Sequence, residues 1–183
     1  FIRCFWRGTT EESEEMFELR MLLYEHYPDL AQELFIDVKS VMEQCEMRAI
    51  KLISFWMKHK IKSQGKYVYH YEEELFDADH SFLVENSESV LMELLPYIPE
   101  SNSIEIKYNE WSGGYWHKRG IERACVELVK KANAALISKS PEKFWKYYEP
   151  YMGKGYFVFN EIILQGLSYL PSDYSDQVIR YIG

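Results

Sequence analysis

The fold class is decided by residues 30–58, LAQELFIDVKSVMEQCEMRAIKLISFWMK. Apolar side chains recur in this stretch at steps of three and four residues. They are Ala31, Leu34, Phe35, Val38, Met42, Cys45, Ala49, Leu52 and Trp56. Because an α-helix has 3.6 residues per turn, this spacing aligns them along one side of a helix. The stretch therefore predicts one amphipathic helix that buries a single apolar face.

The residues before this stretch predict another helix. Thr9 and Thr10 precede an acidic run from Glu11 to Glu15. A hydroxyl there can cap free amide groups, and carboxylates favour the positive end of the helix dipole. The helix would carry Met16, Phe17, Leu19, Leu23 and Tyr24 on its apolar side. Pro28 interrupts the pattern, so we expect this helix to end before it.

The second half of the chain has clearer helix boundaries. Residues 117–137 carry apolar side chains at helical spacing, which are Ile121, Cys125, Leu128, Ala132 and Ala135. The run Ser140-Pro141-Glu142 has the order of an N-cap, a first helical residue and a first-turn acid. It predicts a short helix presenting Phe144, Tyr148 and Tyr151 and ending at Gly153 and Gly155.

Two further helices are expected near the end of the sequence. The first spans about 156–170 and is stopped by Pro171. The second follows Ser175 as its cap and carries Val178, Ile179 and Ile182. Such a broadly apolar last helix lacks the polar outer face of a terminal repeat, and the first residue is Phe1 rather than Met. We therefore expect the sequence to be a fragment of a longer protein.

The middle of the chain has a weaker pattern. Residues 88–98 predict a helix, but the segments 67–71 and 103–108 alternate apolar and polar residues as strands do. A small β-hairpin and irregular aromatic loops packed on helices both fit these two segments. Because short loops between amphipathic helices turn the chain back, the whole pattern predicts an all-α fold of antiparallel helical hairpins stacked as an α-solenoid. We expect one domain over 1–183, with possible sub-halves 1–100 and 115–183.

Composition narrows the class of partner. The chain has 47% hydrophobic residues and a net charge of −8. The apolar content argues against disorder, and the acidity disfavours nucleic acid and anionic membranes. No apolar run approaches the roughly 18 residues of a membrane-spanning helix. Cys4, Cys45 and Cys125 are an odd number at wide spacings, so we expect no disulfide framework and a cytoplasmic location.

Three stretches have the pattern of a known repeat type: FWKYY at 144–148, NEIILQGLSYLP at 160–171 and SDQVIRYI at 175–182. Together they resemble the HEAT-like helical repeats that follow the nucleotide-binding module in bacterial NACHT or STAND-type ATPases. The resemblance covers mainly the C-terminal third, and it implies a sensing or scaffold role beside an ATPase. The segment Gly153-Lys154-Gly155 lacks the remaining residues of a phosphate-binding loop. The resemblance therefore implies that this part does not hydrolyse ATP.

A metal-dependent enzyme is one alternative. His70, Asp77, Asp79 and His80 lie within eleven positions of one another, with Glu72, Glu73 and Glu74 among them. Two histidines and one carboxylate can hold a catalytic zinc ion. The spacing matches no established zinc motif, however, and HExxH is absent. A solvated acidic loop explains the same residues, and we favour it.

A nucleic-acid-binding module is the second alternative. The basic residues Lys58, His59, Lys60, Lys62 and Lys66 are followed by Tyr67, Tyr69 and Tyr71. Cations for phosphates and aromatic planes for bases are the features that bind single strands. The simpler explanation is that cations at a helix C-terminus complement its dipole. Because the chain is acidic overall, we favour this simpler explanation.

The segment 111–119, WSGGYWHKR, is the strongest candidate for partner binding. Its candidate residues are Trp111, Tyr115, Trp116, His117 and Arg119. Trp, Tyr and Arg are enriched among the residues that contribute most to protein–protein binding. Alternatively, both indoles pack beneath the helix that begins at about His117.

No catalytic motif or cofactor-binding motif emerges from the sequence. Cys125 lies on the apolar side of its helix, so it is expected in the core rather than as a nucleophile. The histidines are scattered and form no recognisable nucleophile–base arrangement. The sequence therefore predicts a non-catalytic helical-repeat scaffold or sensor without a cofactor. It would bind a protein partner, a ligand or other domains of the same chain, within a larger protein for which the resemblance implies the STAND type.

Overall fold

The computed structural model describes residues 13–27, 38–62, 78–98, 121–153 and 157–182. All elements in these ranges are helical, and none of the ranges contains a strand. The expectation of an all-α fold is therefore confirmed for this part of the chain. None of the helices described is both long enough and apolar enough to cross a membrane.

The chain divides into two compact units, Phe1–Tyr69 and His70–Gly183. The segments 67–71 and 103–108, for which a β-hairpin was one interpretation, lie outside the described residues. So does the interval between the predicted sub-halves, from 100 to 115.

The first helix described in unit 1 is α2, which spans Glu14–His26. Its N-cap is Ser13, whose Oγ accepts a hydrogen bond from the Met16 amide at 3.3 Å. Two acidic residues in the first turn add a favourable interaction with the helix dipole. The helix ends before Pro28, as expected, but the predicted cap was wrong for α2: Thr9 and Thr10 precede the residue that caps it and lie outside the described ranges.

The predicted single helix over 30–58 is wrong, because the structure divides it. Helix α4 spans Val38–Gln44 and helix α5 spans Glu46–Lys62. Cys45 ends α4 by donating from its amide to the Val41 carbonyl, and it starts α5 by accepting from the amides of Arg48 and Ala49. The break lets α4 pack against α5, which buries Val38 completely. Tertiary packing thus overrides a continuous helical pattern.

Helix α5 forms the core of unit 1. Six consecutive residues of α5 are buried, from Leu52 to Met57. A helix that is apolar on most of its circumference must be covered on several sides. Helix α2 supplies part of that cover through Phe17 and Tyr24, and the Tyr24 ring lies 5.6 Å from the ring of Phe55.

The first helix described in unit 2 is α6, which spans His80–Leu94 and continues into a 3₁₀ turn at Leu95–Tyr97. The sequence predicts a helix over 88–98, so its start was placed about two turns too late. The true start is set by Asp79, whose carboxylate caps the helix. The apolar side chains that α6 buries are Leu83, Val90, Leu91 and Leu94.

Helix α7 spans Ile121–Lys139 and is followed by a compact turn region. A 3₁₀ turn at Pro141–Lys143 leads into α8, Phe144–Tyr148, and a second 3₁₀ turn follows at Glu149–Tyr151. Ser140 occupies the predicted N-cap position, although its side chain makes no capping hydrogen bond. Gly153 has a φ of 72°, a left-handed conformation that glycine adopts at little cost, and it ends this region as predicted.

The last two helices are α9, Phe157–Tyr169, and α10, Ser175–Ile182. A 3₁₀ turn at Ser172–Tyr174 joins them. Ser175 does not cap α10 as predicted, because it is already the first residue of that helix. Its hydroxyl instead donates to the Ser172 carbonyl.

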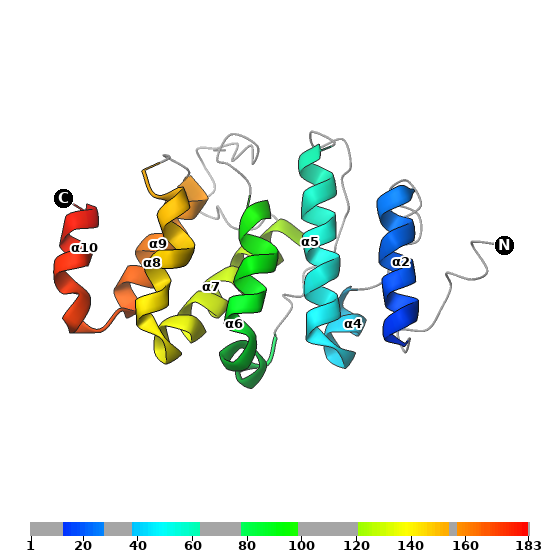
Figure 1. Ribbon diagram of the computed structural model, residues 1–183, viewed down its shortest axis with the longest axis horizontal. Helices are drawn as coiled ribbons and strands as arrows, with labels where there is room; N and C mark the ends of the chain where they lie inside the picture. The colour runs from blue at the N-terminus through cyan, green and yellow to red at the C-terminus, as the bar shows by residue number, and fades with distance from the viewer. Residues whose placement is uncertain (1–12, 28–37, 63–77, 99–120, 154–156, 183) are drawn as a thin grey trace, which may run out of the picture. The chain divides into compact units, whose positions relative to one another are not determined.

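Helix α7 is the centre of unit 2, because it packs against both α6 and α9. The Lys139 ammonium at the end of α7 donates to the carbonyl of Val84 in the first half of α6, so these two helices run antiparallel. The α7 side chains in the core include Cys125, Leu128, Val129, Ala132 and Leu136. Figure 1 shows α6, α7 and α9 as neighbours in green, yellow-green and orange.

Candidate interaction surfaces

The predicted partner-binding residues lie outside the described part of the chain. These are Trp111, Tyr115, Trp116, His117 and Arg119. Their role in binding therefore stays a prediction from the sequence.

Most of the predicted metal-binding set also lies outside, including His70, Asp77 and Glu72–Glu74. Within the set, Asp79 and His80 are described: Asp79 caps α6, and His80 is the first residue of that helix. The Asp79 carboxylate accepts from the Ser81 amide at 2.7 Å and from the Ser81 hydroxyl at 2.9 Å. The amide hydrogen bond, followed by the hydroxyl bond, lowers the pKa of Asp79 below its usual value. Among the described residues, no three His, Cys, Asp or Glu side chains come together as a metal site.

The basic segment proposed for nucleic acid is described only at its start. Lys58 lies 2.9 Å from the carboxylate of Glu25 on α2. The His59 ring is stacked on Phe55, with an interplanar angle of 5°. These two side chains therefore make contacts within unit 1. Lys66 and the three tyrosines that follow lie outside the described residues, so nucleic-acid binding stays untested.

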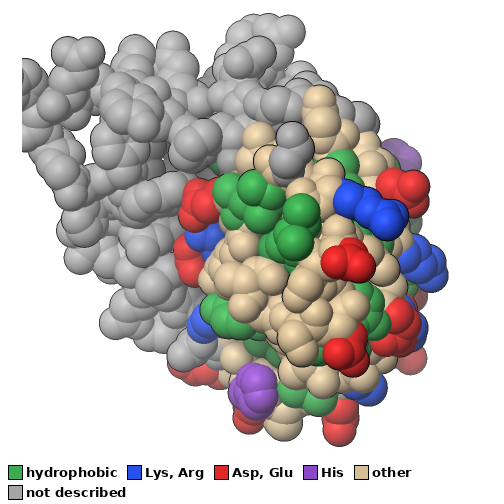
Figure 2. Space-filling view, turned by 90° about the vertical axis from the view of Figure 1, so that its left-hand side faces the viewer, with side chains coloured by type: hydrophobic (Ala, Val, Ile, Leu, Met, Phe, Trp, Pro, Cys, Tyr) green, Lys and Arg blue, Asp and Glu red, His purple; other side chains and the backbone are tan. Residues whose placement is uncertain are grey.

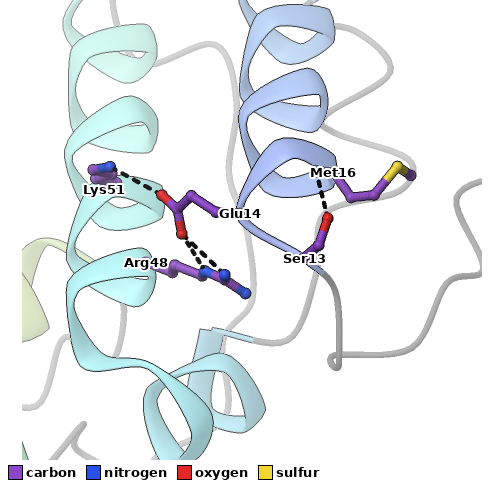
Figure 3. Close-up of polar contacts among 5 residues, drawn as sticks. All are labelled: Ser13, Glu14, Met16, Arg48 and Lys51. Carbon is purple, nitrogen blue, oxygen red and sulfur yellow. Dashed lines mark hydrogen bonds and ion pairs between the residues drawn. The ribbon is translucent and has the colours of Figure 1, made fainter.

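Two sets of ion pairs hold α2 against α5. Near the start of both helices, Glu14 lies 2.9 Å from Arg48 and 3.7 Å from Lys51, as Figure 3 shows. Near the end of both helices, Glu25 lies 2.9 Å from Lys58. Because the start of α2 pairs with the start of α5 and the two ends pair likewise, α2 and α5 run parallel.

A polar cluster joins α6 to α8 in unit 2. The Glu88 carboxylate on α6 accepts hydrogen bonds from the Lys143 ammonium and the Tyr147 hydroxyl. Both bonds lower the pKa of Glu88, and the bond from Lys143 has the larger effect. Burial, together with the bond to Glu88, raises the pKa of Tyr147 to about 12. The cluster fixes the position of the short helix α8 beside the middle of α6.

A polar seam joins α7 to α9. The Lys130 ammonium donates to Glu161 at 2.6 Å, and Asn133, 2% exposed, lies against Gly166. Lys130 meets Glu161, and the later residue Asn133 meets the later residue Gly166, so α7 and α9 run parallel. Phe144 contacts Gly166 from α8.

Two potentially reactive side chains are held in the core of unit 2. Cys125 is completely buried, as predicted, and burial raises the pKa of its thiol to about 12. A thiol with that pKa carries almost no thiolate at neutral pH, so it is a poor nucleophile. Burial also raises the pKa of Tyr148 well above its usual value.

The described surface exposes large hydrophobic side chains on several helices. They are Met16, Leu19, Leu22, Tyr27, Met92, Leu164, Tyr169, Ile179 and Ile182. Figure 2 faces the side where α10 lies and shows hydrophobic side chains at the surface beside acidic and basic ones. Single exposed hydrophobic residues are ordinary, whereas several on one helix mark a surface suited to contact.

The group on α2 is the largest of these on a single helix and its flanking cap. The sequence pattern predicted Met16, Leu19 and Tyr24 together on one apolar side, but the structure buries Tyr24 and exposes the other two. A 100° step per residue puts Leu19 and Leu22 roughly opposite Phe17 and Tyr24. That rotation could have separated the two faces from the sequence alone.

Comparison with known proteins identifies no relative, since no family model, curated protein or solved structure matches this chain.

Proposed function

We propose that this chain is a non-catalytic helical scaffold or sensor module that binds a protein partner, within a larger cytoplasmic protein of possible STAND type. The observation that carries the proposal is the group of exposed apolar residues on α2, a helix that buries its opposite side in unit 1. Exposed apolar side chains grouped on one face are typical of protein contact surfaces.

The helix arrangement supports a solenoid as the architecture of this module. In α-solenoids, helical hairpins stack so that every second helix lies beside its equivalent in the next hairpin. Within unit 2, α6 and α7 run antiparallel, while α7 lies parallel to α9. The ring of Trp145 on α8 also lies 6.2 Å from the ring of Tyr181 on α10. These contacts between alternate helices are those that stacked hairpins require.

The polar groups of the described residues fit a structural role. Asp79 caps a helix, Glu88 joins α6 to α8, and Glu161 joins α7 to α9. Each of these three carboxylates thus has a structural role at a helix start or between two helices. The proposed link to an ATPase rests on the resemblance of the C-terminal repeats alone.

The proposal is tested by quantitative affinity capture from a native lysate. Wild-type chain is compared with a folded Trp111→Ala/Trp116→Ala variant, which removes the two indoles predicted to bind. We expect at least one protein to be recovered above the bead control and to bind the purified chain directly. A loss of that protein with the variant would place its contact at 111–119.

Two results would contradict the proposal. One is substrate turnover by the purified chain that is abolished by substituting its own residues. The other is the absence of any directly binding protein in lysates prepared under several growth conditions.

A further inference from the structure

Helix α2 has an exposed apolar side, which we call the outer face and define by Met16, Leu19 and Leu22. These side chains are 37%, 40% and 53% exposed. The other side of α2 is nearly inaccessible, because Phe17, Arg20 and Tyr24 are each 3% exposed or less. A single helix therefore buries one apolar side in unit 1 and leaves a second one open.

Charge on α2 is distributed unequally between its two sides. The described cations that pair with its carboxylates are Arg48, Lys51 and Lys58, and all three belong to α5. The one arginine of α2, Arg20, is buried. By helical rotation, the exposed Glu15 lies between Leu19 and Leu22. The exposed Glu18 lies beside Leu22, at the edge of the face that is nearer to Glu14 and Glu25. The outer face is thus apolar with acidic residues and no exposed lysine or arginine of its own.

Glu18 is the acid available to a partner. Among the described residues it forms no hydrogen bond or ion pair, whereas Glu15 accepts a hydrogen bond from Ser13 beside the helix start. Hydrogen bonds from the backbone and from Ser13 lower the pKa of Glu15, so its carboxylate stays charged at neutral pH. His26 is the basic residue in the last turn of α2. Its Nδ1 donates a hydrogen bond to the Leu22 carbonyl at 2.9 Å.

We propose that the outer face docks an amphipathic helix of a partner protein that has Leu-like residues on one side and Lys or Arg along its margins. Apolar residues at intervals of three along a helix are matched by a second helix that presents anchors at i, i+3, i+4 and i+7. The flexible thioether of Met16 can adapt to different anchors. Acidic residues beside the face attract a basic helix and speed its association.

The size of the face sets the expected affinity. Helix α2 has 13 residues, which at 1.5 Å each gives a length of about 20 Å. A partner helix of three to four turns covers this length. One helix side is smaller than the roughly 800 Å² per partner of a standard interface, so we expect a dissociation constant on the order of 10 µM. This inference rests on the proposed function and names the chemistry of its partner.

The experiment measures binding of a fluorescent 18-residue Leu/Lys peptide, with leucines at helical spacing, to the 183-residue chain by anisotropy. We expect binding that Leu19→Gln/Leu22→Gln weakens at least about tenfold. Met92→Gln is the matched control, because Met92 is 62% exposed on α6 and should leave affinity unchanged. Glu18→Gln should reduce the salt dependence of binding. Circular dichroism checks that all variants remain folded.

Three outcomes would overturn the inference. The first is that the Leu19→Gln/Leu22→Gln variant binds the Leu/Lys peptide as tightly as the wild-type chain does. The second is that a Leu/Glu peptide of the same pattern binds the wild-type chain as well as the Leu/Lys peptide does. The third is that sedimentation shows a wild-type dimer that this variant loses, in which case a second copy covers the face. If that folded variant still captures the same protein from lysate in equal yield, the inference fails while the proposed function stands. If neither peptide nor protein binds the wild-type chain, both fail.

Discussion

Gly166 lies where α9 comes close to Asn133 of α7 and Phe144 of α8. A Cβ atom at this position would clash with Asn133 Nδ2 and with the Phe144 ring. Both neighbours are buried, and Phe144 is completely enclosed, so neither can move away easily. Gly166→Ala gains up to about 1 kcal/mol in helix propensity. Overpacking costs about 1–3 kcal/mol, so we expect net destabilisation.

The stability of the Gly166→Ala variant is measured by urea unfolding. Ser168→Ala provides the control, because Ser168 is exposed on the same helix and its hydroxyl only bonds a carbonyl of its own turn. A urea midpoint for Gly166→Ala equal to or above that of Ser168→Ala would contradict a close approach of Asn133 and Phe144 to Gly166.

Glu88 gives unit 2 a pH-dependent contribution to stability. Its folded pKa is lowered by hydrogen bonds from Lys143 and Tyr147. The stabilisation is therefore fully present above the unfolded pKa of about 4.3 and is lost as pH falls through the lower folded value. We expect Glu88→Gln to be less stable than wild type at pH 7 and the difference to shrink below about pH 4.

The measurement is a series of urea midpoints between pH 3 and pH 7. Glu85→Gln, one turn earlier on α6, is the matched control because Glu85 is exposed. A stability difference between wild type and Glu88→Gln that is independent of pH would contradict the role of the charged carboxylate.

At the scale of the helix, the start of α6 depends on one side chain. Asp79 accepts from the amide of Ser81, which would otherwise lack a partner within the helix. We expect Asp79→Ala to lower the melting temperature of the chain by a few degrees and Asp79→Ser to retain most of the stability. Hydrogen exchange at the amides of residues 80–83 should rise in the alanine variant only. Equal exchange in both variants would remove capping as the cause.

Helix α2 is held to α5 by two kinds of contact with very different energies. Glu14 is half exposed, so its pairs with Arg48 and Lys51 should contribute about 0–1 kcal/mol and weaken with salt. Phe17 is 1% exposed, and truncation of a buried Phe costs about 3–5 kcal/mol. We therefore expect Phe17→Ala to destabilise α2 far more than Glu14→Gln.

Unfolding in 0.05 M and 0.5 M NaCl separates the two contributions. The effect of Glu14→Gln should fall at the higher salt concentration, whereas that of Phe17→Ala should not. A larger loss from Glu14→Gln than from Phe17→Ala would mean that charge rather than apolar burial attaches α2.

Sequence patterns predicted the existence of helices better than their boundaries. The stop before Pro28 was confirmed because proline has a local and strong effect on the chain. The break at Cys45 was missed, since it carries neither glycine nor proline and arises from packing of α4 on α5. Asp79 was interpreted as a possible ligand, although a capping Asp before a helical run has a recognisable pattern.

For the molecule as a whole, the all-α class followed from helical periodicity along most of the described chain. The solenoid arrangement stays a prediction, because it depends on which helices meet across long separations in sequence. The candidate segment 111–119 lies outside the described residues, so its role remains a prediction. The outer face of α2 was missed because periodicity alone does not say which of two apolar sides is covered.

The buried thiol of Cys125 can be used to detect transient opening of the core of unit 2. A modifying reagent needs both access and thiolate, and the native core supplies neither. Alkylation at this residue therefore requires the surrounding helices to separate first. We expect the labelling rate of Cys125, followed by mass spectrometry, to rise with Gly166→Ala and to remain unchanged with Ser168→Ala. A ligand that tightens unit 2 would then be detected as slower alkylation, without knowledge of where it binds.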